Sequence, residues 1–410
     1  MDNLTHSLAG AALAAAGLRR ASPLAAPTLV LAANAPDIDA FIYFFRDEYF
    51  ALAFRRGWTH GPLAMALLPF LVAGAVLAWD RGIRRRREPG AEPARALPIV
   101  LLAIVGVLTH PALDWMNTYG IRLLAPLSMR WFYGDALFII DPWLWLALGA
   151  ASFLASAPRG RALVAWLALT AAASALVLAV PLVPAGAKAG WLGGLAAIAL
   201  ARWVTGSADA PATLSIRGLD PRSSRRSATR PADAADAVAG RAARRPGSRA
   251  TLAAARWALG VAVAYVVLMV GSGRAAARSV RETAHALGIG PVGRVMVAPT
   301  PANPFRSTVV VETPGAYHLG TFDWLRNPRA RIGTDSILRV PRGPVIDAAA
   351  ATARARNFLV WSRFPVFVVD TLADGYRVRI GDARYPDRGE AGGLSGLVVR
   401  LDRELRPVRR

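Results

Sequence analysis

The sequence contains no cysteine and only one lysine, Lys188, in 410 residues. The first absence excludes disulfide bonds, thiolate nucleophiles and cysteine-based zinc sites, so any metal would need histidine, carboxylate or backbone oxygen ligands. The second means that arginine carries almost all of the net charge of +22. Charged residues make up only 19% of the chain against 54% hydrophobic residues, a balance that favours a membrane protein over a soluble one.

Several familiar signatures are also missing. The sequence holds no G-x-S-x-G elbow and no P-loop, so serine-hydrolase and NTPase functions have no support. Its arginines concentrate between apolar runs, as the positive-inside rule predicts, and we therefore expect no nucleic-acid partner. The stretch MDNLTHSLAGAALAAAGLRR is not expected to be a secretory signal peptide, because its charges follow the apolar run.

Long apolar runs predict an all-α membrane bundle in residues 1–203. About 20 such residues cross a bilayer as a helix. The bundle is expected to have about six to eight spans or re-entrant helices. The clearest runs cover 62–79, 97–113, 161–182 and 252–271, weaker ones cover 136–156 and 187–203, and two short alanine-rich runs at 4–18 and 23–36 either cross the membrane or only enter it.

The rest of the chain changes character twice. Residues 204–251 are rich in Arg, Ala, Ser and Pro, which predicts a disordered cytoplasmic linker before a transmembrane helix at 252–271. Residues 275–410 are expected to form a small β-rich soluble domain, with strand-like runs such as STVVVET and FPVFVVD. The arginine run at 81–87 should be cytoplasmic, and helix counting then places this domain outside the cytoplasm.

Three of the five histidines occur in Thr-His pairs at the ends of apolar runs: THSLAG, THGPLA and THPALD. In the predicted topology these histidines lie near the extracytoplasmic face, together with the carboxylates of NAPDID and of Asp114. His110 and Asp114 are four residues apart and would project together from a helix. The six candidates for a metal site are His6, Asp37, Asp39, His60, His110 and Asp114.

Imidazole and carboxylate together suit zinc, or else manganese or iron, better than magnesium or calcium. The alternative is structural. A histidine in a membrane helix commonly makes a hydrogen bond at a helix interface, and NAPDID also fits a turn with an aspartate capping a helix. A cluster of six ionisable groups at a membrane is costlier than one, which favours the metal site.

The set THS, PDID, RGWTH, HPALDWMNTYG and FIIDPWLW resembles the YdjM-like family of bacterial inner-membrane proteins, described as predicted metal-dependent hydrolases. The resemblance covers roughly residues 1–180 well and the tail more loosely. The His-x-x-x-Asp pair is also similar to one in zinc-dependent phospholipase C, although the further His and Glu ligands of that trinuclear site are lacking. The resemblance implies that the same six residues hold the metal.

Five further residues are candidates for the reaction itself. Asp141, and with it Asp135, could complete the site or act as general base, although Asp141 also fits an N-cap of a helix that begins at Pro142. Asn117 and Tyr119 could bind substrate or orient ligands, or simply form a helix C-terminal turn. Arg130 could bind a phosphate, or belong to an interfacial belt with Trp131.

The first hypothesis is therefore a membrane-bound metal-dependent hydrolase in the bacterial inner membrane. It would cleave an ester or phosphoester of a lipid-linked or amphipathic substrate with a metal-activated water. The second is a transporter or membrane scaffold that uses the His/Asp cluster for ion binding or helix association. His285 and His318 lie in the tail without a carboxylate partner at helical spacing and are not expected to bind metal.

Overall fold

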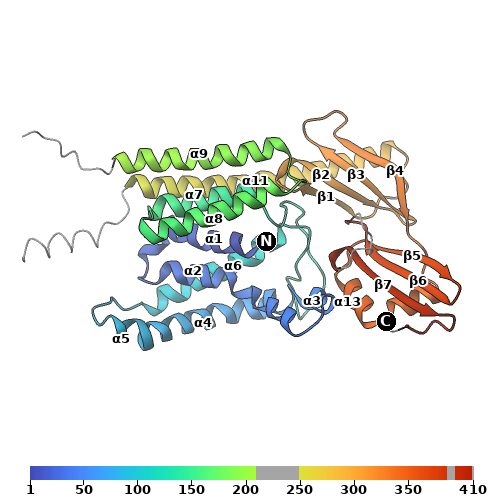
Figure 1. Cartoon of the computed structure of the whole chain (residues 1–410), viewed down its shortest axis with the longest axis horizontal. Helices are drawn as coiled ribbons and strands as arrows, with labels where there is room; N and C mark the ends of the chain where they lie inside the picture. The colour runs from blue at the N-terminus through green and yellow to red at the C-terminus, as the bar shows by residue number, and fades with distance from the viewer. Residues whose placement is uncertain (209–248, 386–392, 409–410) are drawn as a thin grey trace, which may run out of the picture.

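The chain forms a helical bundle followed by two β-sheets (Figure 1). The computed structural model describes residues 1–208, 249–385 and 393–408, so most of the predicted linker at 204–251 lies outside the described residues. The bundle contains α1 Asn3–Ala15, α2 Ala25–Asn34, α3 Glu48–Phe54, α4 Pro62–Trp79, α5 Arg85–Arg87, α6 Ala96–Trp115, α7 Pro142–Ser156, α8 Gly160–Ala179, α9 Ala185–Ala208 and α11 Arg249–Ala286. Between them lie the 3₁₀ helices η1 Leu18–Arg20, η2 Ala35–Phe44 and η3 Trp58–His60 and the π-helical segment η4 Asp80–Arg84.

Within the described ranges, four helical segments are long and apolar enough to cross a membrane: Pro62–Arg87, Ala96–Trp115, Gly160–Ala179 and Thr251–Ala286. The predicted number of six to eight is not confirmed. With 13 and 10 residues, α1 and α2 are too short to span, since they would reach about 20 and 15 Å across a hydrocarbon core of about 30 Å. α7 is apolar but has only 15 residues.

The two short helices lie inside the bundle. α1 packs against α2 on one side and α7 on the other, and α2 packs against α6. The outer helices α4 and α8 keep broad apolar faces exposed, as lipid-facing helices do. The N-terminal halves of α1 and α4 and the C-terminal end of α6 lie at the same end of the bundle, and the arginines of α5 lie at the opposite end (Figure 1).

α11 connects the bundle to the first sheet. The helix continues beyond the predicted span at 252–271 as far as Ala286, and its last turns leave the bundle. There the small apolar residues Ala276, Val280 and Ala284 recur every four residues and pack into a buried core with the sheet residues Val309 and Phe322. One rigid helix therefore spans the boundary where the sequence indicates two separate segments.

The β-rich part consists of two antiparallel sheets, as the strand-like runs predict. The first sheet orders its strands β1-β2-β3-β4, and the second β5-β6-β7. Phe364 and Met296 belong to a buried core that contains residues of both sheets. The elements are β1 Val295–Thr300, β2 Asn303–Glu312, β3 Ala316–Asp323, β4 Ala330–Leu338, α12 Pro344–Ala350, α13 Ala353–Trp361, β5 Pro365–Leu372, β6 Gly375–Asp382, η5 Gly393–Ser395 and β7 Gly396–Asp402.

The β-rich part covers the end of the bundle where α6 finishes (Figure 1). α13 packs against α3. The loop after α6 is held by three side-chain contacts: Trp131 Nε1 donates to Val360 O at 2.8 Å, Arg363 pairs with Asp135 at 2.9 Å, and Arg384 Nη1 donates to Thr118 O at 2.8 Å. This loop follows Asp114 directly, so the β-rich part fixes one wall of the candidate site.

Candidate metal centre

Four of the predicted ligands converge in space. One ligand atom from each of Asp37, His60, His110 and Asp114 lies within 4.8 Å of the other three. The four residues come from η2, η3 and α6, and all are buried. A buried group of two imidazoles and two carboxylates is a ligand set that zinc and similar divalent ions use in proteins.

Two glycines bring the helices that carry these residues close together. A Cβ on Gly10 of α1 would lie 2.7 Å from Leu29 O of α2, and a Cβ on Gly106 of α6 would lie 2.6 Å from the Cβ of Ala32. The absence of side chains lets α1 and α6 approach α2 from two sides. His6 and His110 each lie four residues from one of these glycines, and their rings stack with centroids 3.8 Å apart.

A third glycine fixes the segment of His60. A Cβ on Gly61 would lie 1.8 Å from the carbonyl oxygen of Ala125, so any other residue would push away the loop that follows α6. Pro62 at the first turn of α4 then begins the helix. The sequence THGP thus places His60 between the start of α4 and this loop.

The Nδ1 atoms of His60 and His110 both make hydrogen bonds within the protein. His110 Nδ1 lies 2.7 Å from Ala33 O, and because a carbonyl only accepts, Nδ1 carries the proton. His60 Nδ1 lies 2.8 Å from Thr59 Oγ1, and that hydroxyl donates to Asp39 Oδ2 at 2.9 Å. The hydroxyl oxygen therefore accepts from Nδ1. Both Nε2 atoms are left with unshared electron pairs, which is how outer hydrogen bonds orient histidine ligands.

These two lone pairs face each other. The Nε2 atoms of His60 and His110 are 3.1 Å apart, and they lie 3.4 and 3.5 Å from Asp114 Oδ2. Asp37 Oδ1 lies 3.9 Å from His110 Nε2. Ligands held at about 2.1 Å by a tetrahedral ion are roughly 3.4 Å from one another. So many acceptors at this spacing repel unless a proton or a metal ion lies among them, and the residues fit a divalent metal.

His6 and Asp39 lie beside these four residues. His6 Nε2 is 3.3 Å from Asp114 Oδ1, so it can add a ligand or steer that carboxylate. Asp39 is engaged by the backbone N–H of Arg56 at 2.8 Å and by Thr59, and it orients His60. The structure therefore brings all six predicted residues together, with Asp39 in a supporting position.

Two arginines that the sequence analysis did not select lie inside the cluster. Arg55 Nη2 donates to Asp37 at 2.8 Å, and Arg56 Nε forms an ion pair with Asp114 Oδ2 at 3.0 Å, although its angle is not that of a hydrogen bond. The amino group of Met1 also donates to Asp114. Arg56 is the first residue of the RGWTH motif and Arg55 directly precedes it, and this position was the signal that could have identified them.

Asn117 and Tyr119 border the cluster through Arg56. Arg56 Nη1 donates to Asn117 Oδ1 at 3.1 Å, and the guanidinium carbon lies 4.6 Å from the centre of the Tyr119 ring. In the described part of the chain, Asn117 Nδ2 and the Tyr119 hydroxyl are buried without a hydrogen-bond partner. Two free donors near the candidate ligands are consistent with the substrate-binding role predicted for these residues.

The other three candidates have separate surroundings. Asp141 caps α7: its Oδ1 accepts from the N–H groups of Trp143 and Leu144, and Tyr265 donates to Oδ2 at 2.8 Å. Burial raises the pKa of Asp141 to about 6. Asp135 pairs with Arg363, although burial still raises its pKa. Arg130 lies over the Phe132 ring on the surface. None of the three belongs to the group of four ligands, so a role in the reaction stays a prediction.

Comparison with known proteins agrees with the resemblance noted in the sequence. Residues 1–185 match the model of a family described as YdjM inner membrane protein, and this part of the chain contains all six predicted metal ligands. No curated protein and no solved structure matches the chain. The family and the apolar helices together support a multi-pass protein of the inner membrane.

Proposed function

We propose that the protein is a membrane-bound metal-dependent hydrolase that acts on an ester or phosphoester of an amphipathic or lipid-linked substrate. The observation that carries this proposal is the pair of Nε2 atoms, 3.1 Å apart, that lie 3.4 and 3.5 Å from the same buried carboxylate oxygen. Zinc is the first choice of metal, with manganese the alternative, because the ligands are imidazole and carboxylate.

Each residue of the cluster has a task in this proposal. His60, His110, Asp114 and Asp37 would hold the metal, which when bound supplies Lewis acidity and lowers the pKa of a water molecule. Thr59 and the carbonyl of Ala33 keep the two imidazoles in the ligating tautomer. Arg56 balances the charge of Asp114, and the free donors of Asn117 and Tyr119 would orient the substrate. Hydrolysis adds water across the scissile bond to give an acid and an alcohol.

The surface beside the cluster supports an amphipathic substrate. Asp37 and Arg55 are the members closest to solvent, and the guanidinium of Arg55 lies 5.6 Å from the Tyr43 ring. The side chains of Asp37 and Asp39 in η2 are buried. In the same segment, the side chains of Phe41 and Phe44 are 61% and 80% exposed. Aromatic side chains of this kind concentrate at membrane interfaces. A lipid-linked substrate could therefore reach the cluster by lateral diffusion, with Arg55 contacting an anionic group.

We further propose that this end of the bundle and the β-rich part face the extracytoplasmic side. The arginines of α5 lie at the opposite end, where the positive-inside rule places the cytoplasm. The cluster then sits under the β-rich part, which would shield or select the substrate. This orientation can be tested by the accessibility of single cysteines introduced at either end of the bundle, because the chain has no cysteine of its own.

A second candidate function is a cation-bound scaffold. It is favoured by burial, because the side chains of His6, His60, His110 and Asp114 are 0% exposed, as in structural metal sites that have no open position. In that case the metal fastens α1, α6 and η3 together and no substrate is converted.

The two functions are tested by metal content and hydrolysis measured on the same preparations. Detergent-purified wild type is expected to hold at least one zinc or manganese ion per chain, and His60→Ala and His110→Ala are expected to lose it. His318→Ala, in β3, is the matched control. Fluorogenic phosphodiester and carboxylic ester lipids in mixed micelles then report activity. Metal without hydrolysis of either class would favour the scaffold, and no metal after reconstitution would refute both.

A further inference from the structure

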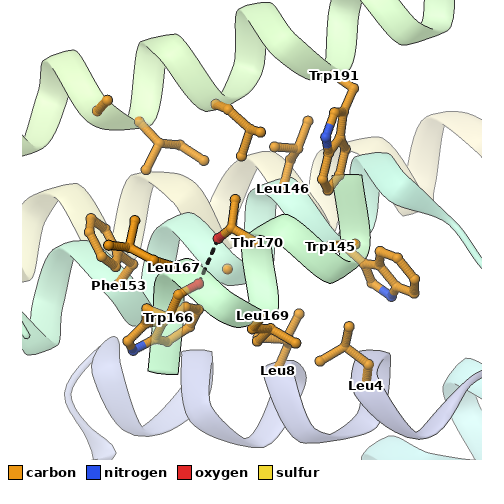
Figure 2. Close-up of a pocket in the computed structure, with 15 residues that line it drawn as sticks. Leu4, Leu8, Trp145, Leu146, Phe153, Trp166, Leu167, Leu169, Thr170 and Trp191 are labelled. Carbon is orange, nitrogen blue, oxygen red and sulfur yellow. Dashed lines mark hydrogen bonds between the residues drawn. The ribbon is translucent and has the colours of Figure 1, made fainter. Parts of the chain in front are cut away.

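A second feature of the bundle is an apolar cavity of about 250 Å³ between α1, α7, α8 and α9 (Figure 2). Leu8 of α1 and Trp145 of α7 form its inner wall, and Trp191 of α9 lies across from them. Its lining includes one hydroxyl, that of Thr170, which donates to the backbone oxygen of Trp166 at 2.8 Å. The cavity therefore offers a ligand mainly apolar contact.

The surroundings of the cavity determine what can fill it. α8 is one of the four helices of membrane-spanning length, and its residue Leu167 lines the cavity while remaining 59% exposed. The solvent at this depth is hydrocarbon rather than water. A buried water molecule needs several hydrogen-bond partners, which an apolar lining does not supply. Apolar cavities therefore stay dry and take up apolar ligands.

We infer that this cavity binds an acyl chain of a membrane lipid. Its volume lies below the roughly 300–1,000 Å³ of sites for drug-sized ligands, so it has room for part of one acyl chain and not for a whole lipid. Three tryptophans among the lining residues, Trp145, Trp166 and Trp191, give the chain broad flat contact surfaces. The lipid's head group would remain outside the cavity.

The acyl-chain site shares a helix with the metal centre. Leu4 and Leu8 of α1 line the cavity, whereas His6 lies between them in sequence and on the opposite side of the helix. Trp145 joins this wall of the cavity to α1, because its ring lines the cavity and its Nε1 donates at 3.0 Å to Oγ1 of Thr5, the residue before His6. A bound chain thus packs directly on the helix that positions His6.

Gly149 of α7 offers a way to fill the cavity without disturbing the protein. It lines the cavity, and a Cβ added there would find no atom of the described chain within 4 Å. A larger side chain at this position would occupy the space of the ligand, and replacing glycine within a helix favours the helix. Gly193 of α9 also has open space around it but does not line the cavity, which makes it a matched control.

The test uses phosphatidylethanolamine–phosphatidylglycerol vesicles in which a fraction of the lipid carries a photoreactive diazirine on its acyl chain. After irradiation, peptide mass spectrometry locates the labels. We expect labels on Leu8 and Trp145. These residues are only 6% and 7% exposed, so lipid that stays outside the cavity does not contact them. Gly149→Phe is expected to abolish these two labels, Gly149→Leu to reduce them, and Gly193→Phe to leave them unchanged.

Labels confined to outward residues such as Leu167, or inner labels that persist in Gly149→Phe, would overturn the acyl-chain site. Monodisperse gel filtration confirms that each variant is folded. The inference does not require the proposed hydrolase, since an acyl chain needs no metal. Treatment with EDTA is therefore expected to leave the inner labels intact, whatever the metal measurements show.

Discussion

Two buried aspartates, one in each half of the molecule, illustrate two uses of a carboxylate. Asp382 at the end of β6 is 0% exposed, yet both of its oxygens accept several hydrogen bonds. They come from the Ser362 hydroxyl, the Arg384 guanidinium and three backbone N–H groups. Burial alone would raise the pKa of Asp382, but Arg384 and these donors hold it at about 2. This carboxylate is satisfied by the protein itself.

Asp114 at the end of α6 is equally buried but has different neighbours. Its Oδ2 has no hydrogen-bond partner among the described residues and lies 3.4 and 3.5 Å from the Nε2 atoms of His60 and His110. Within the described ranges, the cations that pair with it are Arg56 and the Met1 amino group. A buried polar atom that is left unsatisfied costs free energy, so a site that gathers acceptors around it is suited to a cation. The comparison separates a structural carboxylate from a candidate ligand.

The largest expected effect comes from making the same change at both positions. Asp114→Asn should reduce metal affinity by at least about 100-fold, because an amide is a poorer ligand and brings an N–H group towards the imidazoles. Asp382→Asn should leave metal content unchanged but destabilise the protein by about 3–5 kcal/mol, since Arg384 loses its buried partner. Plasma mass spectrometry and thermal unfolding measure the two quantities. Equal effects of both substitutions on metal content would remove the distinction.

A smaller effect is expected from Thr59→Val, which tests the orientation of a ligand rather than the ligand itself. The valine cannot accept from His60 Nδ1 or donate to Asp39, so the imidazole loses its fixed tautomer. Loss of such an outer hydrogen bond typically weakens metal binding about 10–100-fold. Competition titration with a chelating dye measures this affinity. Thr308→Val in β2 is the control, and an affinity unchanged by Thr59→Val would show that the tautomer is not set by this chain of contacts.

The smallest effect concerns pH. The pKa of Asp382 in the folded protein is about 2, below its usual value of 3.8. Its contribution to stability is therefore complete above about pH 4 and is lost as the pH falls through 2. This contribution amounts to about 2 kcal/mol. Circular dichroism melts in detergent at pH 5, 4 and 3 should show a decline that is shallower in Asp382→Asn. A parallel decline in both proteins would assign the acid sensitivity to other groups.

Local pattern was sufficient for most of the elements and for the six candidate ligands. The apolar runs at 62–79, 97–113 and 161–182 correspond to α4, α6 and α8, and the strand-like composition of STVVVET and FPVFVVD predicted strands that correspond to β2 and β5. The spacing of His110 and Asp114 on one helix needed no tertiary information. The repeated Thr-His pairs then indicated that distant segments share one site, and the structure places His60 beside His110.

Other features depend on neighbours that no local pattern identifies. The short α1 and α2 resemble weak spans in the sequence, but packing inside the bundle makes their length sufficient. From the sequence, Asp141 fits either a general base or a helix N-cap, and the structure shows that it caps α7. The ion pair of Asp135 with Arg363 could not be predicted from any local pattern. The sequence shows Arg56 in a histidine motif, but only the fold shows that its guanidinium lies against Asp114.

The sequence by itself determined the membrane bundle, the β-rich tail and the six residues of the candidate metal centre, because each follows from periodicity, composition or a short motif. Tertiary structure alone decided which oxygen atoms remain unsatisfied, which imidazole nitrogens are free, and that a cavity lies on the other side of α1. Those outcomes depend on close packing at Gly10, Gly61 and Gly106, where segments far apart in the chain come within contact distance.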